Sequence, residues 1–243
     1  MSLQTKINFR EKALTQNQGL NYIYKKFHEE IKSKLVDGVS LEIGSGSSNY
    51  KEFDRNIITS DIIYDKRLDF VFDALRIPFK DSSISNLILF DVLHHIEKPL
   101  DFLSEADRVL RTNGRIILVE PYVSPFSWLI YKLFHDEDTS FRFDLESPFS
   151  KQAEKKQPFD GNQAIPSSIF FRKKEIIRNK FPFFKVINCE KRSLFSYPLT
   201  FGLKSKGFFP LSFIKFIYKI EAPFEPLLGS LFAFRMFVVV EKI

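Results

Sequence analysis

The chain has 243 residues, of which 44% are hydrophobic and 27% charged, so it can build a packed core and is not globally disordered. Cys189 is the single cysteine, which excludes an internal disulfide framework and a zinc site built on cysteines. Residues 1–12 are charged and polar, and no stretch of about 18 uncharged apolar residues occurs. We therefore expect a cytoplasmic protein without a signal peptide or a membrane-spanning helix.

Phenylalanine and charge are both distributed unevenly along the chain. Residues 1–122 contain 8 of the 29 phenylalanines, and residues 123–243 contain 21. The first half has a net charge of −1 and the second half +7, within a total of +6. The two halves are thus expected to do different jobs. The net positive charge is compatible with acidic partners, including nucleic acid and anionic membrane surfaces.

The order of the expected elements indicates one α/β domain over residues 1–243. Residues 20–35 carry apolar side chains at helical spacing, and a further helix is expected over residues 99–111. Strands are expected at residues 39–43, 57–59, 70–72, 86–93, 115–119, 186–189 and 234–240. This alternation predicts a mostly parallel sheet. We divide the domain into a helical segment (1–38), a core (39–122) and two insertions (123–180 and 193–231).

A glycine-rich turn follows the first expected strand, in residues 41–46 (LEIGSG). Glycines let a ligand approach the backbone closely, and the N–H groups at a following helix start would face that ligand. Glu42 lies in this motif, and Asp61 ends the next strand, where a carboxylate can accept both hydroxyls of a ribose. Each of these acids alone could also be a solvated carboxylate at the end of a strand, so only their combination points to a ligand site.

Together these motifs resemble the class I S-adenosylmethionine-dependent methyltransferases with small-molecule acceptors, over about residues 38–122. Residues 41–46 are similar to the family's acidic-x-Gly-x-Gly loop, residues 73–79 (DALRIPF) to its adenine-binding segment, and residues 91–96 to the end of its fourth strand. The resemblance implies a Rossmann-like fold whose seven-stranded sheet is mostly parallel with an antiparallel last strand. It also implies S-adenosyl-L-methionine as cofactor, bound by Glu42, Gly44, Ser45, Gly46, Asp61, Ile62, Asp73, Ala74 and Asp91.

The chain departs from the family pattern in two places. Ser48 stands where many members have a third glycine, and serine remains a good residue for a helix start. The link from Asp61 to Asp73 is short for the usual crossover helix, so we expect a turn or no helix there.

The resemblance implies methyl transfer, and a hydroxyl acceptor would need a general base. The candidates are His94, His95 and Glu120, at the ends of the fourth and fifth strands, and His135 in the first insertion, which is followed by Asp136 and Glu137. If His94 and His95 continued their strand they would point in opposite directions, so at most one would face the cleft. Purely structural roles remain open for all of these residues. The four histidines show no zinc-ligand spacing, so we expect no metal site.

The acceptor is the least defined part of the prediction. Residues 91–94 (DVLH) lack the Pro-Pro-aromatic segment typical of base-amine methylation, and Cys189 lies on a late strand, which disfavours a pyrimidine C5 mechanism. We favour O-methylation of a small molecule or a lipid-linked glycan. A nicotinamide-dependent oxidoreductase is one alternative, although Asn49 replaces the third glycine of that motif. A catalytically silent S-adenosylmethionine-binding protein is the other.

Residues 207–220 (GFFPLSFIKFIYKI) would form a helix with lysines on one narrow stripe. We interpret this segment as a lid packed over the acceptor pocket. A helix lying on an anionic membrane surface and a homodimer interface are the alternatives. Nucleic acid is a weaker fit, because no RNA-binding module is visible.

Overall fold

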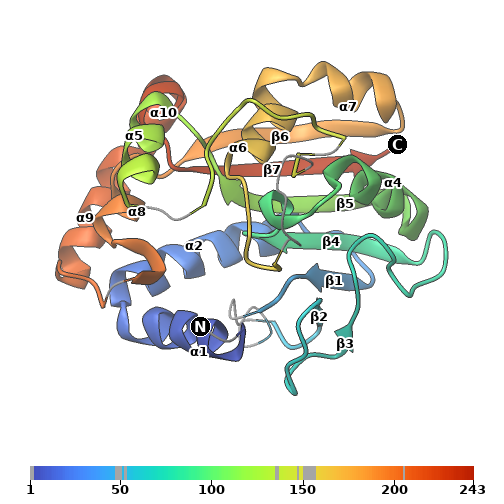
Figure 1. Ribbon diagram of the computed structural model, residues 1–243, viewed down its shortest axis with the longest axis horizontal. Coiled ribbons are helices and arrows are strands. Elements are labelled where there is room, and N and C mark those ends of the chain that lie inside the picture. The colour runs from blue at the N-terminus through green and yellow to red at the C-terminus, as the bar shows by residue number, and fades with distance from the viewer. Residues whose placement is uncertain are drawn as a thin grey trace.

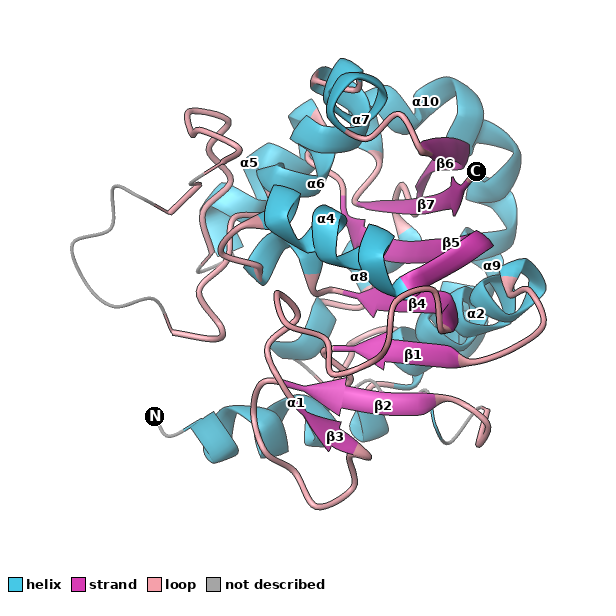
Figure 2. Ribbon diagram, turned by 90° about the vertical axis from the view of Figure 1, so that its right-hand side faces the viewer, coloured by secondary structure: helices cyan, strands magenta, loops and turns pink. Residues whose placement is uncertain are grey.

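A computed structural model describes residues 3–46, 51, 54–134, 137–146, 148–149, 157–204 and 206–243. Its centre is a seven-stranded sheet in the order β3-β2-β1-β4-β5-β7-β6 (Figures 1 and 2). The strands are β1 (Ser40–Ile43), β2 (Ile58–Asp61), β3 (Phe70–Val71), β4 (Ile84–Phe90), β5 (Leu110–Pro121), β6 (Phe184–Arg192) and β7 (Arg235–Lys242). Strands β1 to β5 run parallel, and β7 is antiparallel to both of its neighbours. The predicted sheet is thereby confirmed.

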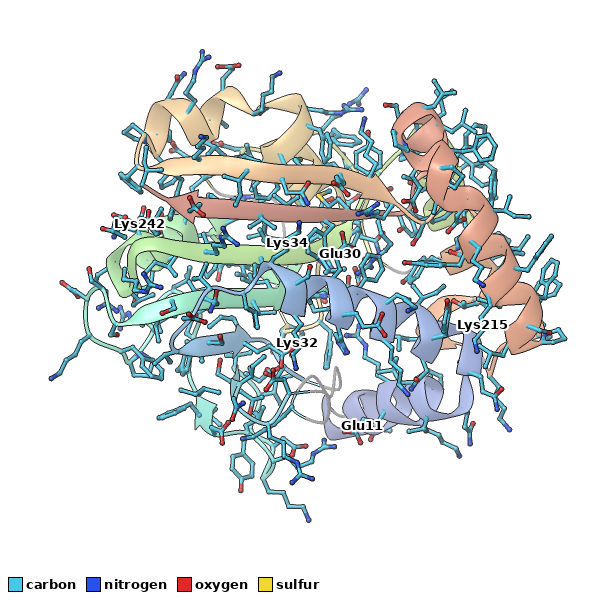
Figure 3. The ribbon with its side chains drawn as sticks, turned by 180° about the vertical axis from the view of Figure 1, so that it is seen from behind. Glu11, Glu30, Lys32, Lys34, Lys215 and Lys242 are labelled. Atoms are coloured by element: carbon cyan, nitrogen blue, oxygen red, sulfur yellow. The ribbon has the colours of Figure 1, made fainter. Side chains whose placement is uncertain are left out.

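Helices cover both faces of the sheet because the central strands are buried on both sides. In β4, Leu87 and Leu89 pack in one core with α4 (Pro99–Val109), whereas Ile88 and Phe90 pack in a second core with α2 (Gln18–Lys34). Figure 3 shows α2 lying across its face of the sheet, with the labelled Glu30, Lys32 and Lys34 along it. Three more helical elements join the α4 side, namely α6 (Ala164–Ser167), η2 (Ser168–Arg172) and α7 (Glu175–Lys180).

The remaining helices gather at the end of the sheet toward which the parallel strands point. They are α5 (Pro125–Phe134), α8 (Ser196–Leu199), α9 (Leu211–Glu221) and α10 (Glu225–Phe232), together with the turns η3 (Gly202–Lys204) and η4 (Ala222–Phe224), on the left of Figure 1. The N-terminal helix α1 (Leu3–Gln16) packs against α2 and η3. No helix of the described chain is both long and apolar enough to cross a bilayer.

Two local expectations were wrong. The fourth strand ends at Phe90 and not at residue 93, because Asp91 has a left-handed backbone (φ 58°) that turns the chain into η1 (Leu93–His95). The Phe-rich helix starts at Leu211 and not at residue 207, because Gly207 has φ 81° and Pro210 lies directly before the first turn. As expected, residues 62–72 contain no crossover helix.

Candidate functional site

The glycine turn after β1 forms one wall of a cavity at the carboxyl ends of the parallel strands. Gly44 and Gly46 have positive φ angles of 68° and 38°. A Cβ on Gly44 would lie 2.5 Å from a methyl carbon of Val92, so a larger residue would push the turn away from β4. The Ser45 N–H donates to the Ser60 carbonyl (2.8 Å), which ties the turn to β2. The turn is therefore fixed with its backbone facing the cavity.

Asp61 ends β2 beside this turn. Its Oδ2 accepts a hydrogen bond from the Gly46 N–H (2.9 Å), and its Oδ1 accepts one from the Ile63 N–H (2.9 Å). Burial raises the pKa of the Asp61 carboxyl, and these backbone hydrogen bonds partly oppose that effect. The carboxylate is thus held in place, with lone pairs left for a ligand's hydroxyls.

The cavity beside the turn has a volume of about 270 Å³. Eight of the nine residues that the resemblance assigned to the cofactor line it, namely Gly44, Ser45, Gly46, Asp61, Ile62, Asp73, Ala74 and Asp91. The ninth, Glu42, is buried in β1 and is not part of the lining. Arg10 and Leu14 of α1 and residues 157–159 also line the cavity, although no motif pointed to them.

A second and larger cavity, of about 1340 Å³, adjoins the first. We call it the aromatic cavity, because twelve of the residues that line it are phenylalanine or tyrosine, many of them in α5, in α8 and in residues 201–208. Both cavities are lined by the same six border residues, Arg10, Tyr24, Asp91, His95, Phe159 and Leu203. The two spaces therefore meet at the ends of β4 and α2.

His94 is buried between two carboxylates. Its Nδ1 lies 2.7 Å from Glu120 Oε2, and its Nε2 lies 3.4 Å from Glu137 Oε2. Glu120 Oε1 also accepts hydrogen bonds from the backbone N–H groups of Val92 (2.9 Å) and Leu93 (2.7 Å). Burial lowers the pKa of His94, but the two glutamates outweigh burial and raise it to about 10. Both ring nitrogens of His94 are thus engaged within the protein.

His95 stands in a different environment, although its ring packs 4.0 Å from that of His94. Its Nδ1 lies 3.2 Å from the Asp160 carbonyl oxygen, which can only accept, so Nδ1 carries the proton and Nε2 the lone pair. Burial and the neighbouring His94 lower the pKa of His95 to about 3. A Cβ on Gly161 would lie 2.7 Å from His95 Nδ1, so a glycine is needed for this contact.

The expectation that at most one histidine faces the cleft was wrong, because both line the aromatic cavity. The chain turns at Asp91, and the two histidines lie in η1 instead of continuing β4. Of the other base candidates, Glu120 is buried beneath His94, and His135 lies outside the described residues.

Arg235 is a residue of this site that the sequence did not single out. It begins β7, is 2% exposed, and its Nη1 lies 2.6 Å from Asp91 Oδ1. The Tyr24 hydroxyl donates to the other Asp91 oxygen (3.2 Å). The guanidinium carbon lies 5.0 Å from the ring centre of Tyr197. Arg235 and Tyr24 therefore hold the Asp91 carboxylate on the border of the two cavities.

The fold also brings together groups that sequence spacing could not relate. His94, His95 and Glu137 each offer a ligand atom within 4.8 Å of the others, as do Asp91, His94 and Glu120. Both groups share His94, whose nitrogens are already paired with glutamates, so we interpret them as one ion-pair cluster. The absence of a metal site stays a prediction.

Comparisons with known proteins agree with this geometry. Residues 41–118 match the family model described as a methyltransferase domain. An uncharacterized protein of Methanocaldococcus jannaschii is 35% identical over 104 residues, which are 40% of this chain and 51% of that protein. A probable polyketide synthase of Dictyostelium discoideum is 31% identical over 121 residues, or 48% of this chain and 5% of that one. The chain thus spans about half the length of the first relative and 5% of the second.

Solved structures resemble the chain over almost its whole length. A methyltransferase of Archaeoglobus fulgidus has a TM-score of 0.54 at 15% identity, covering 92% of this chain and 94% of that one. A possible histamine N-methyltransferase of Thermotoga maritima has a TM-score of 0.52 at 15% identity, with coverage of 97% and 95%. At such identities the likeness shows the fold alone.

The fold is that of the class I S-adenosylmethionine-dependent methyltransferases. The residues that match the methyltransferase-domain model, 41–118, include the glycine turn, Asp61, Asp73 and Asp91 of the cavity. The cavity fits the cofactor of this class, because the glycine turn offers bare backbone, and Asp61 and Asp73 offer carboxylates at the ends of β2 and β3. When bound there, S-adenosylmethionine would supply a methyl group on a positively charged sulfur.

Proposed function

We propose that this protein transfers a methyl group from S-adenosylmethionine to a hydroxyl oxygen of an apolar or lipid-linked acceptor held in the aromatic cavity. The observation that carries the proposal is the shared border of the two cavities at Asp91 and His95. An acceptor in one cavity and a cofactor in the other could meet only at such a border. Holding the two in line accounts for most of the catalysis that this reaction needs.

Methylation of a hydroxyl oxygen releases one proton, which a base has to take up. Bound S-adenosylmethionine would supply the methyl carbon and keep the electron pair of the broken bond on its sulfur, so the acceptor oxygen would form the new bond to that carbon. The acceptor proton then has to leave. We assign its removal to Nε2 of His95, because the Asp160 carbonyl fixes the ring as the tautomer with its lone pair on Nε2. With a pKa of about 3 the ring is a weak base, so it takes the proton as the new oxygen–carbon bond forms and the hydroxyl proton becomes strongly acidic.

His94 suits this role less well than His95. Both of its nitrogens face carboxylates, and the raised pKa keeps its ring protonated at neutral pH. We therefore interpret His94, Glu120 and Glu137 as the group that fixes η1 and thus places His95. Asp91, held by Arg235 and Tyr24, is interpreted as a polar contact for the acceptor or the cofactor.

The size and chemistry of the aromatic cavity define the acceptor class. Its volume of about 1340 Å³ exceeds what a drug-sized molecule requires. Its wall is mostly aromatic and aliphatic, whereas the polar residues Arg10, Asp91 and His95 lie at the border with the cofactor cavity. An acceptor with a long apolar part and one polar end fits this division, with the polar end presented to the methyl group.

The test is transfer of labelled methyl from S-adenosylmethionine to a chloroform–methanol extract of cell lipids. We expect label in the organic phase, and His95→Gln should lower the rate by roughly 100-fold or more, the usual contribution of a general base. His28→Gln is the matched control, because His28 packs on Phe90 and lines neither cavity. Label that enters only water-soluble acceptors, or equal rates for His95→Gln and His28→Gln, would contradict the proposal.

A further inference from the structure

One end of the molecule has a large apolar surface, which we call the apolar rim. Its most exposed members are Leu227 (77% exposed), Phe208 (76%) and Phe134 (70%). The other members are Phe201, Phe213, Phe216, Ile220, Phe224 and Leu231. They come from α5, from the segment before α9, and from α9, η4 and α10, which lie together on the left of Figure 1. Monomeric proteins rarely leave so many large apolar side chains together in water.

The rim is an organised helix face. Along α9, η4 and α10, exposed apolar residues recur every three or four positions, at Phe213, Phe216, Ile220, Phe224, Leu227 and Leu231. The inward positions Ile214 and Gly229 are buried. Figure 3 shows α9 at the edge of the molecule beyond the end of α2, with the labelled Lys215 on it. The apolar stripe of these helices therefore faces outward, whereas their buried positions also include the acids Glu221 and Glu225.

The charges around the rim select its partner. Residues 196–232 contain two acids, and both are buried: Glu221 accepts from the Ser196 N–H (2.9 Å) and Glu225 from the Ser193 N–H (2.6 Å). The exposed charges that the structure describes in this segment are Lys206, Lys215 and Lys219. Apolar side chains flanked by cations match an anionic lipid surface. A second copy of the chain would bring lysines against lysines.

The rim also surrounds the mouth of the aromatic cavity. Phe134, Phe201, Phe208, Ile220 and Phe224 are exposed at the surface and line the cavity as well. An apolar molecule that leaves a bilayer at the rim would pass directly between these side chains.

We propose that the apolar rim docks onto an anionic lipid bilayer, so that the acceptor enters the aromatic cavity from the membrane without crossing water. The inference depends on the proposed function only for the identity of the molecule that enters. Docking itself follows from the exposed side chains and the lysines, and it needs neither cofactor nor turnover.

The experiment is flotation of the full chain, without cofactor, on vesicles of phosphatidylcholine alone and of phosphatidylcholine mixed with phosphatidylglycerol. We expect binding to the mixed vesicles and much weaker binding to phosphatidylcholine. The variant Phe216→Glu, Leu227→Glu should bind the mixed vesicles roughly tenfold or more weakly, because both side chains point outward. Neither residue lines the aromatic cavity, so the cavity stays intact.

The matched control is Val186→Glu, Ile187→Glu, which adds the same charge at two exposed apolar positions on the edge strand β6. It should bind like the wild type. Absence of wild-type flotation, or equal loss in both double variants, would overturn the proposal. A dimer seen by light scattering that Phe216→Glu, Leu227→Glu abolishes, with no vesicle binding, would instead assign the rim to a second copy. Methyl transfer could fail while flotation succeeds, so the two proposals are separable.

Discussion

At the scale of single residues, Asp61 is the residue on which we expect cofactor binding to depend most. Its two oxygens already organise the Gly46 and Ile63 N–H groups, and the same carboxylate faces the cavity. Asp61→Ala should weaken S-adenosylhomocysteine binding by more than tenfold in calorimetry, since it removes the acceptor for the ribose hydroxyls. Asp101→Ala, on the exposed side of α4, is the control. Unchanged affinity in Asp61→Ala would remove this residue from the site.

His28 gives a pH dependence whose sign can be worked out. Burial lowers its pKa from 6.5 to about 4, so between these values the unfolded chain binds a proton that the folded chain does not. Stability is then lost as the pH falls from about 6.5 to 4, and the pKa difference corresponds to about 3 kcal/mol. Urea unfolding at pH 7 and pH 4 should show a smaller loss for His28→Gln than for the wild type. An equal loss of stability in the wild type and in His28→Gln would show that His28 does not cause this pH dependence.

At the scale of secondary-structure elements, the Arg235–Asp91 pair joins β7 to the end of β4. Arg235→Met would leave the Asp91 carboxylate in the interior without its cation. Because the Asp91 side chain is 25% exposed, we expect a cost of about 3 kcal/mol, at the low end for such pairs. Adding Asp91→Asn should recover part of this loss in urea unfolding. If the changes in the free energy of unfolding of the two single variants simply added up in the double variant, Arg235 and Asp91 would not be energetically coupled.

The elements differ in how well the sequence predicted them. β1 and β4 were predicted within three residues because they are buried apolar runs bounded by glycine or charge. β5 starts five residues before its predicted start, in residues expected to end a helix. The expected cofactor residues share one cavity because each lies at the end of a parallel strand. Arg235 was missed because its partner Asp91 is 144 positions away, and only the antiparallel pairing of β7 with β5 brings them together. Helix α1 lies within the expected helical segment 1–38, but its own bounds were not predicted, because it has little amphipathic pattern.

At the scale of the whole molecule, the uneven phenylalanine distribution has two structural causes. Some second-half aromatic residues wall the aromatic cavity, such as Phe126 and Phe234, while others form the apolar rim, such as Phe216. The interpretation as a lid accounts for the first group only. The sequence could not distinguish the cavity-lining aromatic residues from those of the apolar rim. A periodic apolar pattern does not show which face of a helix will be covered by other elements.

The central claim is that the cavity at the glycine turn binds S-adenosylmethionine, and titration calorimetry of the wild-type chain with S-adenosylhomocysteine and with NADH tests it most directly. We predict one S-adenosylhomocysteine bound per chain and no heat of binding with NADH, because the turn, Asp61 and Asp73 line one cavity and lie within the residues that match a methyltransferase domain. Binding of NADH without binding of S-adenosylhomocysteine, or binding of neither, would contradict it.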